Sequence, residues 1–181
     1  MEAIERALAE NRRALTEYEA KRLLAGYGIP VTRETVASSR ADTVDAARSI
    51  GFPVVIKGSG AELMHKSEAG AVLVNILNEA DVTAAFDDVS RRLGSKFEGV
   101  LVQEMIKGRR ELVIGMHREP HFGPCVMLGL GGVMTEIIND TAFRVAPFDE
   151  IEALDMVSHL RAKQIFDADR KSTRLNSSHY S

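Results

Sequence analysis

The chain lacks several features that would place it in a class at once. It has one cysteine, Cys125, so it can form no intramolecular disulfide and has no cysteine spacing of a metal site. Its apolar runs are far shorter than the ~20 residues that a helix needs to cross a bilayer. No G-x-x-x-x-G-K-[ST] phosphate loop occurs in it. Disulfide scaffolds, membrane-spanning helices and P-loop nucleotidases are therefore excluded.

An excess of basic charge is also lacking. The formal net charge is -3, so no nucleic-acid partner is expected. The first residues, MEAIERALAENRR, are amphipathic and acidic at their start, unlike a secretory signal. Hydrophobic residues make up 45% and charged residues 27% of the chain, an ordinary globular balance. We expect a cytoplasmic protein with neither a nucleic-acid nor a membrane partner.

The last twelve residues, RKSTRLNSSHYS (170–181), differ from the rest. They contain one large aliphatic residue, Leu175, and follow neither helical nor strand periodicity, which predicts a disordered tail. The segment also resembles translated sequencing-adapter DNA, so we expect the native sequence to stop near Asp169.

Four helices are predicted from their N-terminal caps. In each, a short polar residue precedes an acidic residue three positions later, and apolar residues with helical spacing follow. The cap pairs are Thr16 with Glu19, Ser39 with Asp42, Asn78 with Asp81 and Asp149 with Glu152. The core face predicted for the last helix consists of Ile151, Leu154, Val157 and Leu160.

Short apolar runs between these helices predict strands. The segment AVLVNI places Val72, Val74 and Ile76 on one face. The first half of the chain alternates helix and strand, whereas the second half is mostly strands of antiparallel type with one helix. This predicts an α/β (α+β) fold with two lobes that meet near residues 99–106, a helical lead-in at 1–14 and a main domain at 15–169.

Lys57 ends an apolar strand and precedes Gly58-Ser59-Gly60. A lysine there holds a compact positive charge where glycines and exposed backbone N–H groups let a polyphosphate approach. From spacing alone, a solvated lysine after an edge strand explains the pattern as well.

The following loop contains His65-Lys66-Ser67-Glu68. A neutral imidazole is a good nucleophile for phosphoryl transfer near pH 7, Glu68 could orient it, and Lys66 could neutralise phosphate charge. No second histidine or cysteine lies at ligand spacing, so a metal site is disfavoured. A polar surface loop is the alternative.

Gln103-Glu104-Met105-Ile106 leaves a strand where the lobes are expected to meet, a common position for a ligand. Backbone groups there could contact a purine, and the carboxylate of Glu111 could hold ribose hydroxyls. An ordinary strand end followed by a charged turn is the alternative. The three glycines of GLGG (129–132) permit close approach to a phosphate or form a tight turn.

Together these segments resemble an ATP-grasp domain, specifically the nucleotide-binding part of an NDP-forming acyl-CoA synthetase (acetate–CoA ligase, ADP-forming, β subunit or β region). The resemblance runs from Leu15 to Phe166 and is carried by LTEYEAKRLLAGYGIPV, GFPVVIKGSGAELMHKSEAGAV, VLVQEMIKGRRELVIGM and GLGGVMTEIINDTAFRVAP. The succinyl-CoA synthetase β subunit is a more distant likeness.

The resemblance implies roles for individual residues. Lys57 corresponds to the lysine that contacts the α- and β-phosphates of ATP or ADP, Gln103 to Ile106 to the segment that frames adenine, and Glu111 to the ribose carboxylate. His65 corresponds to the histidine that carries a phosphoryl group, and Glu68 stands where the family pattern often has aspartate.

The implied reaction converts acyl-CoA, phosphate and ADP into acid, CoA and ATP. An acyl phosphate forms on a CoA-binding α subunit or fused α region, which is the expected partner. The family's Mg²⁺ ligands lie late in the domain and are absent before the tail, so no metal ligand is assigned and the chain is expected to be C-terminally truncated and inactive alone.

Two other functions stay open. Similar ATP-grasp regions regulate protein acyltransferases to which they are fused, and ATP-grasp carboxylate–amine ligases form acyl phosphates without a phosphohistidine. The acyl substrate and the choice between ADP and GDP are not indicated by the sequence.

Overall fold

The computed structural model describes residues 2–60, 70–108, 111–131 and 140–164. The chain forms two compact units, Met1–Lys107 and Gly108–Ser181. The division follows directly after the predicted 99–106 junction. Within the described residues no helix is long and apolar enough to cross a membrane. The predicted tail at 170–181 lies outside the described residues and stays a prediction.

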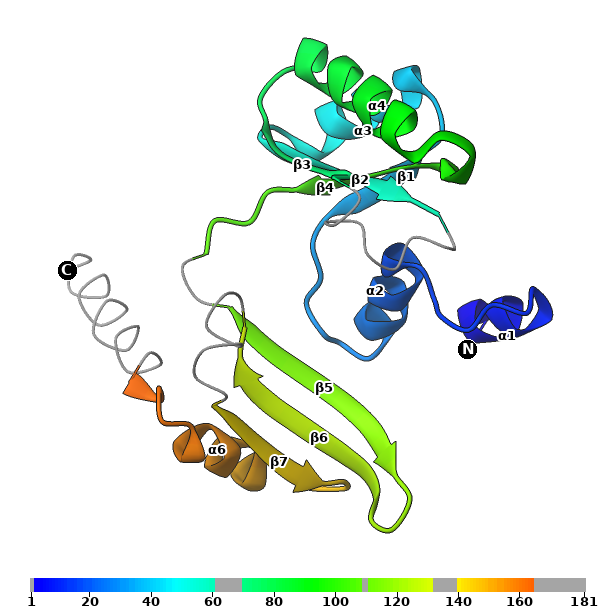
Figure 1. Ribbon diagram of the computed structural model, residues 1–181. Helices are drawn as coiled ribbons and strands as arrows, with labels where there is room; N and C mark the ends of the chain where they lie inside the picture. The colour runs from blue at the N-terminus through cyan, green and yellow to red at the C-terminus, as the bar shows by residue number, and fades with distance from the viewer. Residues whose placement is uncertain (1, 61–69, 109–110, 132–139, 165–181) are drawn as a thin grey trace, which may run out of the picture. The chain divides into compact units, whose positions relative to one another are not determined.

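The first unit is a four-stranded antiparallel sheet with helices. Its elements are α1 (Glu2–Ala9), α2 (Glu17–Gly26), β1 (Glu34–Ala37), α3 (Arg40–Ile50), β2 (Val54–Ser59), β3 (Val72–Ile76), α4 (Glu79–Leu93), a 3-10 turn (Gly94–Lys96) and β4 (Gly99–Glu104). The strand order is β1-β4-β2-β3. Helices α3 and α4 lie together on one face of the sheet, and α2 lies on the other (Figure 1).

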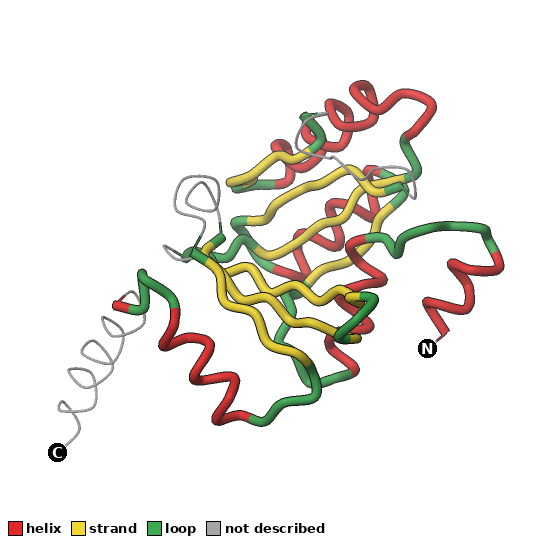
Figure 2. The backbone as a smooth tube through the Cα atoms, turned by 60° about the horizontal axis from the view of Figure 1, so that its bottom comes forward, coloured by secondary structure: helices red, strands yellow, loops and turns green. Residues whose placement is uncertain are grey.

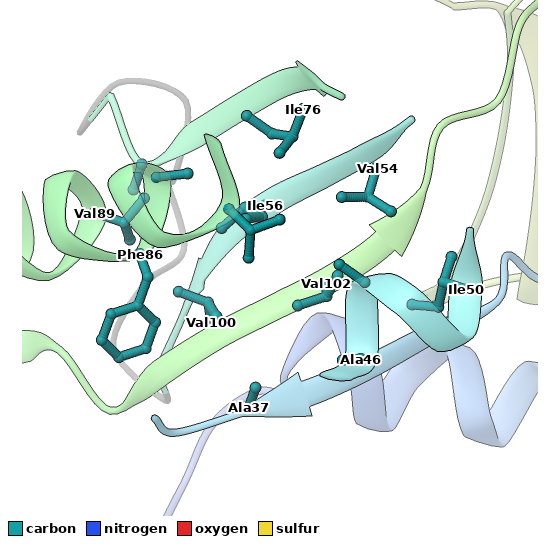
Figure 3. Close-up of a cluster of buried hydrophobic side chains, with 14 of the residues drawn as sticks. Ala37, Ala46, Ile50, Val54, Ile56, Ile76, Phe86, Val89, Val100 and Val102 are labelled. Carbon is teal, nitrogen blue, oxygen red and sulfur yellow. The ribbon is translucent and has the colours of Figure 1, made fainter. Parts of the chain in front are cut away.

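The core of this unit fills the space between the sheet and helices α3 and α4. Val54 and Ile56 of β2 and Val100 and Val102 of β4 are fully buried there and point toward the helices (Figure 3). Alternation along a strand sends every second side chain to the same face, so the residues between them leave on the opposite face. Lys57 is one of these.

The predicted caps are confirmed in the first unit. Thr16 accepts a hydrogen bond from the Glu19 amide, and the Glu19 carboxylate accepts one from the Thr16 amide. Ser39 and Asn78 cap α3 and α4 through the amides of the residues three positions later. Each cap satisfies N–H groups that have no partner within the helix, which fixes where the helix begins.

The predicted face of β3 is wrong. Val54 and Ile56 of β2, two residues apart, lie opposite Ile76 and Leu73, which are three residues apart. This extra residue is a β-bulge, and Asn75 within it has a φ of 59°. The bulge turns Leu73 and Ile76 toward the core and leaves Val74 exposed.

The second unit contains a three-stranded antiparallel sheet and one helix. The order is β5-β6-β7, formed by Leu112–Glu119, Gly123–Leu130 and Thr141–Val145, with α6 at Glu150–His159. Helix α6 runs beside β7, and both views show it along one face of the sheet (Figures 1 and 2). Cys125 is a buried free thiol in β6, as its apolar surroundings predict.

The predicted core face of α6 is only half correct. Leu160 is buried and Val157 packs against the core, but Ile151 and Leu154 are 77% and 62% exposed. Met156 is buried instead and packs with Leu128 of β6. Asp149 caps the helix as predicted. The apolar residues of α6 are compatible with two different core faces, and packing against the sheet determines which of them is buried.

Candidate functional site

The prediction that Lys57 ends its strand is wrong, because β2 continues through Gly58 and Ser59, which stay paired with β4. The side chain of Lys57 leaves the strand on the sheet face that carries α2. Gly58, the next residue, faces the helices, where an added Cβ would lie 2.6 Å from Leu93 Cδ1 and 3.2 Å from the Ala71 Cβ. Lys57 pairs across the sheet with Leu101 on one side and Val72 on the other. Its side chain retains 20% exposure. A cation is therefore placed on a partly covered sheet face by a strand whose other face is fixed in the core.

A charged cluster surrounds Lys57; we call it the polar cluster. The Nζ atoms of Lys57 and Lys21 both donate to Oε1 of Glu17, at 2.7 and 2.9 Å. Lys21 Nζ also donates to Glu34 Oε2 at 2.7 Å and to Thr32 Oγ1 at 3.2 Å. The polar cluster thus consists of Glu17, Lys21, Thr32, Glu34 and Lys57, with two positive and two negative charges that alternate.

Two members of the polar cluster, Glu17 and Lys21, are ionised at neutral pH. Burial of the Glu17 carboxyl opposes its ionisation, but hydrogen bonds from Lys57 and Lys21 outweigh this and lower the pKa of Glu17 to about 2. Burial likewise disfavours the charged form of Lys21, but its hydrogen bonds to Glu34 and Glu17 raise its pKa above the ordinary value. The site therefore presents ionised groups to any ligand.

Glu17 is held in place by the start of α2. Glu17 is the first residue of the helix, directly after the Thr16 cap. Arg12 binds the cap carboxylate of Glu19 with two hydrogen bonds of 2.8 Å each. The hydrogen bond from Arg12 is the main reason that the pKa of Glu19 is lowered to about 2. Two parallel charge-assisted bonds fix geometry as well as adding energy.

The segment predicted to frame adenine continues from β4 of the same sheet. Gln103 is paired in register with Glu34 of β1 and Val55 of β2. The Oε1 atoms of Gln103 and Glu34 are both buried without a hydrogen-bond partner. Two acceptors at facing positions present a site for an N–H donor on this sheet face.

The next residues of that segment use their own polar groups within the protein. The Glu104 carboxylate accepts from the amide and from Nε of Arg33, at 2.8 and 2.9 Å, and the first of these bonds is the main reason that the pKa of Glu104 is lowered. The amide of Glu104 donates to the Arg33 carbonyl, and that of Met105 to the Pro53 carbonyl. Ile106 is 63% exposed. These contacts hold the end of β4 to β1 and β2.

Of the remaining predicted residues, Glu111 belongs to the second unit. Its carbonyl accepts a 2.7 Å hydrogen bond from the amide of Gly131, where an added Cβ would lie 3.0 Å from the Glu111 Cβ. Gly129 likewise packs against Thr141 and Asp140, so these two glycines serve strand packing. His65 to Glu68 and residues 132–139 lie outside the described residues.

Four members of the polar cluster were not singled out from the sequence: Glu17, Lys21, Thr32 and Glu34. The segment TEYEAK indicated a helix cap, and the four-residue spacing of Glu17 and Lys21 was compatible with a surface ion pair. Their contacts with Lys57 and Glu34 span 40 and 13 residues. No local signal could have indicated them.

The described residues contain no cluster of metal-ligating side chains. Among residues 2–60, 70–108, 111–131 and 140–164, no group of three or more histidine, cysteine, aspartate or glutamate side chains could hold a metal ion. The carboxylates of the polar cluster are taken up by lysines. The described residues therefore do not fit a Mg²⁺ site.

Comparison with known proteins relates this geometry to a family. The ATP-grasp domain family model matches residues 6–179. The β subunit of ADP-forming acetate–CoA ligase I from Pyrococcus furiosus is 40% identical over 180 residues, covering 97% of this chain and 77% of that subunit. The ADP-forming 4-hydroxybutyrate–CoA ligase of Nitrosopumilus maritimus is 40% identical over 166 residues, covering 89% of this chain. The chain spans only 24% of that longer relative.

Two solved structures are similar to this chain over about nine-tenths of its length. The dinucleotide-forming acetyl-coenzyme A synthetase 1 of Ca. Korarchaeum cryptofilum, in complex with coenzyme A, Ca-AMPCP and HgCl⁺, matches with a TM-score of 0.85 at 40% identity, covering 89% of this chain and 72% of that chain. A second structure of the same protein holds coenzyme A and Mg-AMPPCP, and its phosphohistidine segment points towards the nucleotide binding site. This structure matches with a TM-score of 0.78 at 39% identity, covering 90% of this chain and 71% of that chain. The chain belongs to the ATP-grasp family, among the β subunits and β regions of ADP-forming acyl-CoA ligases.

Proposed function

We propose that this chain is the nucleotide-binding part of an ADP-forming acyl-CoA synthetase, acting with a CoA-binding α subunit or fused α region. The observation that carries the proposal is the placement of Lys57. A strand lysine on the sheet face opposite the core, partly exposed and paired with the carboxylate of Glu17, is suited to a polyphosphate. The relatives that share this domain are named as ligases of this type.

In this proposal the nucleotide lies on the Lys57 face of the four-stranded sheet. The ammonium of Lys57 contacts the α- and β-phosphates, and the segment Gln103 to Ile106 frames the adenine. The buried acceptors of Gln103 and Glu34 support the recognition of a base with an exocyclic amine on this face. Glu111 is proposed as the ribose carboxylate.

The chemical step is proposed to pass through His65. An imidazole nitrogen attacks the phosphorus of an acyl phosphate supplied by the partner, the P–O bond to the acyl group breaks, and the carboxylate leaves with the electron pair. A terminal phosphate oxygen of ADP then attacks the phosphohistidine, the P–N bond breaks, and ATP forms. The phosphohistidine segment of the Ca. Korarchaeum cryptofilum enzyme supports this assignment.

Nucleotide binding is the first test. Calorimetric titration of the 181-residue chain with ADP and with ATP is expected to show binding. Lys57→Met, which keeps the aliphatic length without the charge, is expected to weaken it about tenfold or more, the size of a lost hydrogen bond to a charged group. Equal affinity of the two proteins would count against Lys57 as a phosphate ligand.

The route through His65 is tested in the complete synthetase. With His65→Ala, acyl-CoA-dependent ATP formation is expected to fall to background, and acid-labile labelling by phosphate is expected to vanish. Full turnover by this variant would favour a carboxylate–amine ligase mechanism instead. An acetyltransferase domain in the adjoining reading frame, with no turnover in either protein, would favour the regulatory function.

A further inference from the structure

We propose that Glu17 is a positioning residue that holds Lys57 for the nucleotide phosphates. The inference rests on the proposed function, because it concerns the same lysine. It adds a residue on another element, α2, that acts on the nucleotide through Lys57.

The first step is the shared oxygen atom. Glu17 Oε1 accepts from Lys57 at 2.7 Å and from Lys21 at 2.9 Å. Lysine has a flexible four-carbon stem, so an isolated ammonium on a sheet face would sample many rotamers. A charge-assisted bond of 2.7 Å to a fixed oxygen selects one position. Lys21 in turn fixes that oxygen from the other side.

The second step is that Glu17 cannot easily move. It lies at the first position of α2, where the helix dipole favours a carboxylate. The cap formed by Thr16 and Glu19, together with Arg12, fixes the start of the helix. An oxygen at this position is therefore a fixed point to which the Lys57 ammonium is tied.

The third step concerns what holds α2 to the sheet. None of the ten residues of α2 is fully buried. The helix is joined to the strands through ion pairs: Glu17 to Lys57 of β2, and Lys21 to Glu34 of β1, whose side chain is 5% exposed. Since no residue of α2 is buried, these ion pairs are the contacts through which the helix fixes the position of the Lys57 side chain.

A phosphate can bind without breaking this arrangement. An ammonium has three N–H donors, so Lys57 can keep its bond to Glu17 while it donates to a phosphate oxygen. Protein kinases, which have a different fold, use the same pairing: a helix glutamate holds the strand lysine that contacts the α- and β-phosphates. The opposite effect, in which Glu17 competes with phosphate for Lys57, predicts tighter nucleotide binding when the carboxylate is removed.

The experiment compares Glu17→Gln with a matched control, Glu79→Gln. Glu79 is also the first residue of a helix and pairs with an arginine, Arg48, through bonds of 2.6 and 2.7 Å. It has no contact with the polar cluster in the described residues. Both variants lose one carboxylate charge at a helix start, so a general effect on charge or stability appears in both. Circular dichroism checks that each variant is folded.

Two quantities are measured on the full chain. The first is the Kd for ADP, which is expected to rise about tenfold in Glu17→Gln and to stay unchanged in Glu79→Gln. The second is the rate at which Lys57 is acetylated by acetic anhydride without nucleotide, read by mass spectrometry. It is expected to rise several-fold in Glu17→Gln only, because the ammonium loses its partner. Glu17→Asp keeps the charge and is expected to recover part of the affinity.

The outcomes separate the inference from the proposed function. Weaker ADP binding with faster Lys57 acetylation supports both. Unchanged or tighter ADP binding in Glu17→Gln overturns the positioning role, as does an unchanged acetylation rate. If the unaltered chain binds no ADP, the proposed function fails and the nucleotide role of Glu17 fails with it; the acetylation rates then still show whether Glu17 holds Lys57.

Discussion

Among the described residues, fifteen buried side chains join the four-stranded sheet of the first unit to two helices, whereas the core cluster of the second unit contains three. On the first sheet the face opposite this core carries Lys57 and the polar cluster. In the second unit Ile114 and Met116 of β5 remain 72% and 73% exposed. Within the part of the chain that the structure describes, the first unit therefore has the larger apolar core and carries a charged site on the opposite face of its sheet.

The largest effect is expected from a core truncation in the first unit. Ile56 has no exposed surface, so Ile56→Ala is expected to cost about 2–5 kcal/mol of unfolding free energy through lost burial and a cavity. Ile114→Ala makes the same change at an exposed strand residue of the second unit and is expected to change stability by less than about 0.5 kcal/mol. Urea unfolding followed by circular dichroism measures both. Equal losses would contradict the difference drawn between the two units.

A smaller effect is expected from a polar contact of the second unit. The buried carboxylate of Asp140 accepts hydrogen bonds from the backbone amides of Arg161 and Ala162, at 2.8 and 2.9 Å. Asp140→Ala leaves two amides without their partner and is expected to cost about 1–3 kcal/mol.

The matched control is Glu119→Ala. The carboxylate of Glu119 accepts hydrogen bonds from the amides of His121 and Phe122 in the turn after β5, at the surface of the protein. Water can replace that carboxylate, so a much smaller loss is expected. Hydrogen exchange of the amides in α6 measures the difference. Equal protection in the two variants would show that Asp140 does not hold the end of α6.

The smallest effect is a pH dependence that arises in the first unit. The pKa of Glu19 falls from 4.5 to about 2 in the folded chain, so its contribution to stability is present above pH 4.5 and is lost as pH falls toward 2. The pair with Arg12 lies near the surface, so the contribution is about 1 kcal/mol or less. In Glu19→Gln the unfolding midpoint is expected to vary less between pH 4.5 and 2 than in the unaltered chain. Parallel curves for the two proteins would contradict this assignment.

Local sequence was sufficient for the helix starts. Thr16, Ser39, Asn78 and Asp149 all cap helices as predicted, because a cap depends only on residues within one turn. The buried face of α4 follows one apolar stripe with helical spacing, made of Val82, Ala85, Phe86, Val89 and Leu93. The antiparallel sheet of the second unit agrees with the strand pattern predicted for the second half of the chain.

Local sequence failed where two arrangements had similar apolar patterns. Along β3 a single bulged residue at Asn75 changed which side chains face the core. On α6 the choice between Ile151 and Met156 depended on contact with Leu128 of β6, which lies far away in sequence. These decisions depend on packing against another element, and periodicity contains no information about that element.

The sequence by itself determined where the helices begin, and it showed that the first half of the chain mixes helices and strands while the second half is rich in strands. Only the tertiary structure decided that Lys57 meets a carboxylate 40 residues earlier in the chain and that Lys21 and Glu34 complete a neutral cluster. The physical reason is the distance along the sequence between the groups that interact. Helix caps are set by backbone groups within a few residues, whereas an ion pair between a helix and a strand forms only after the sheet has placed both charges on one face.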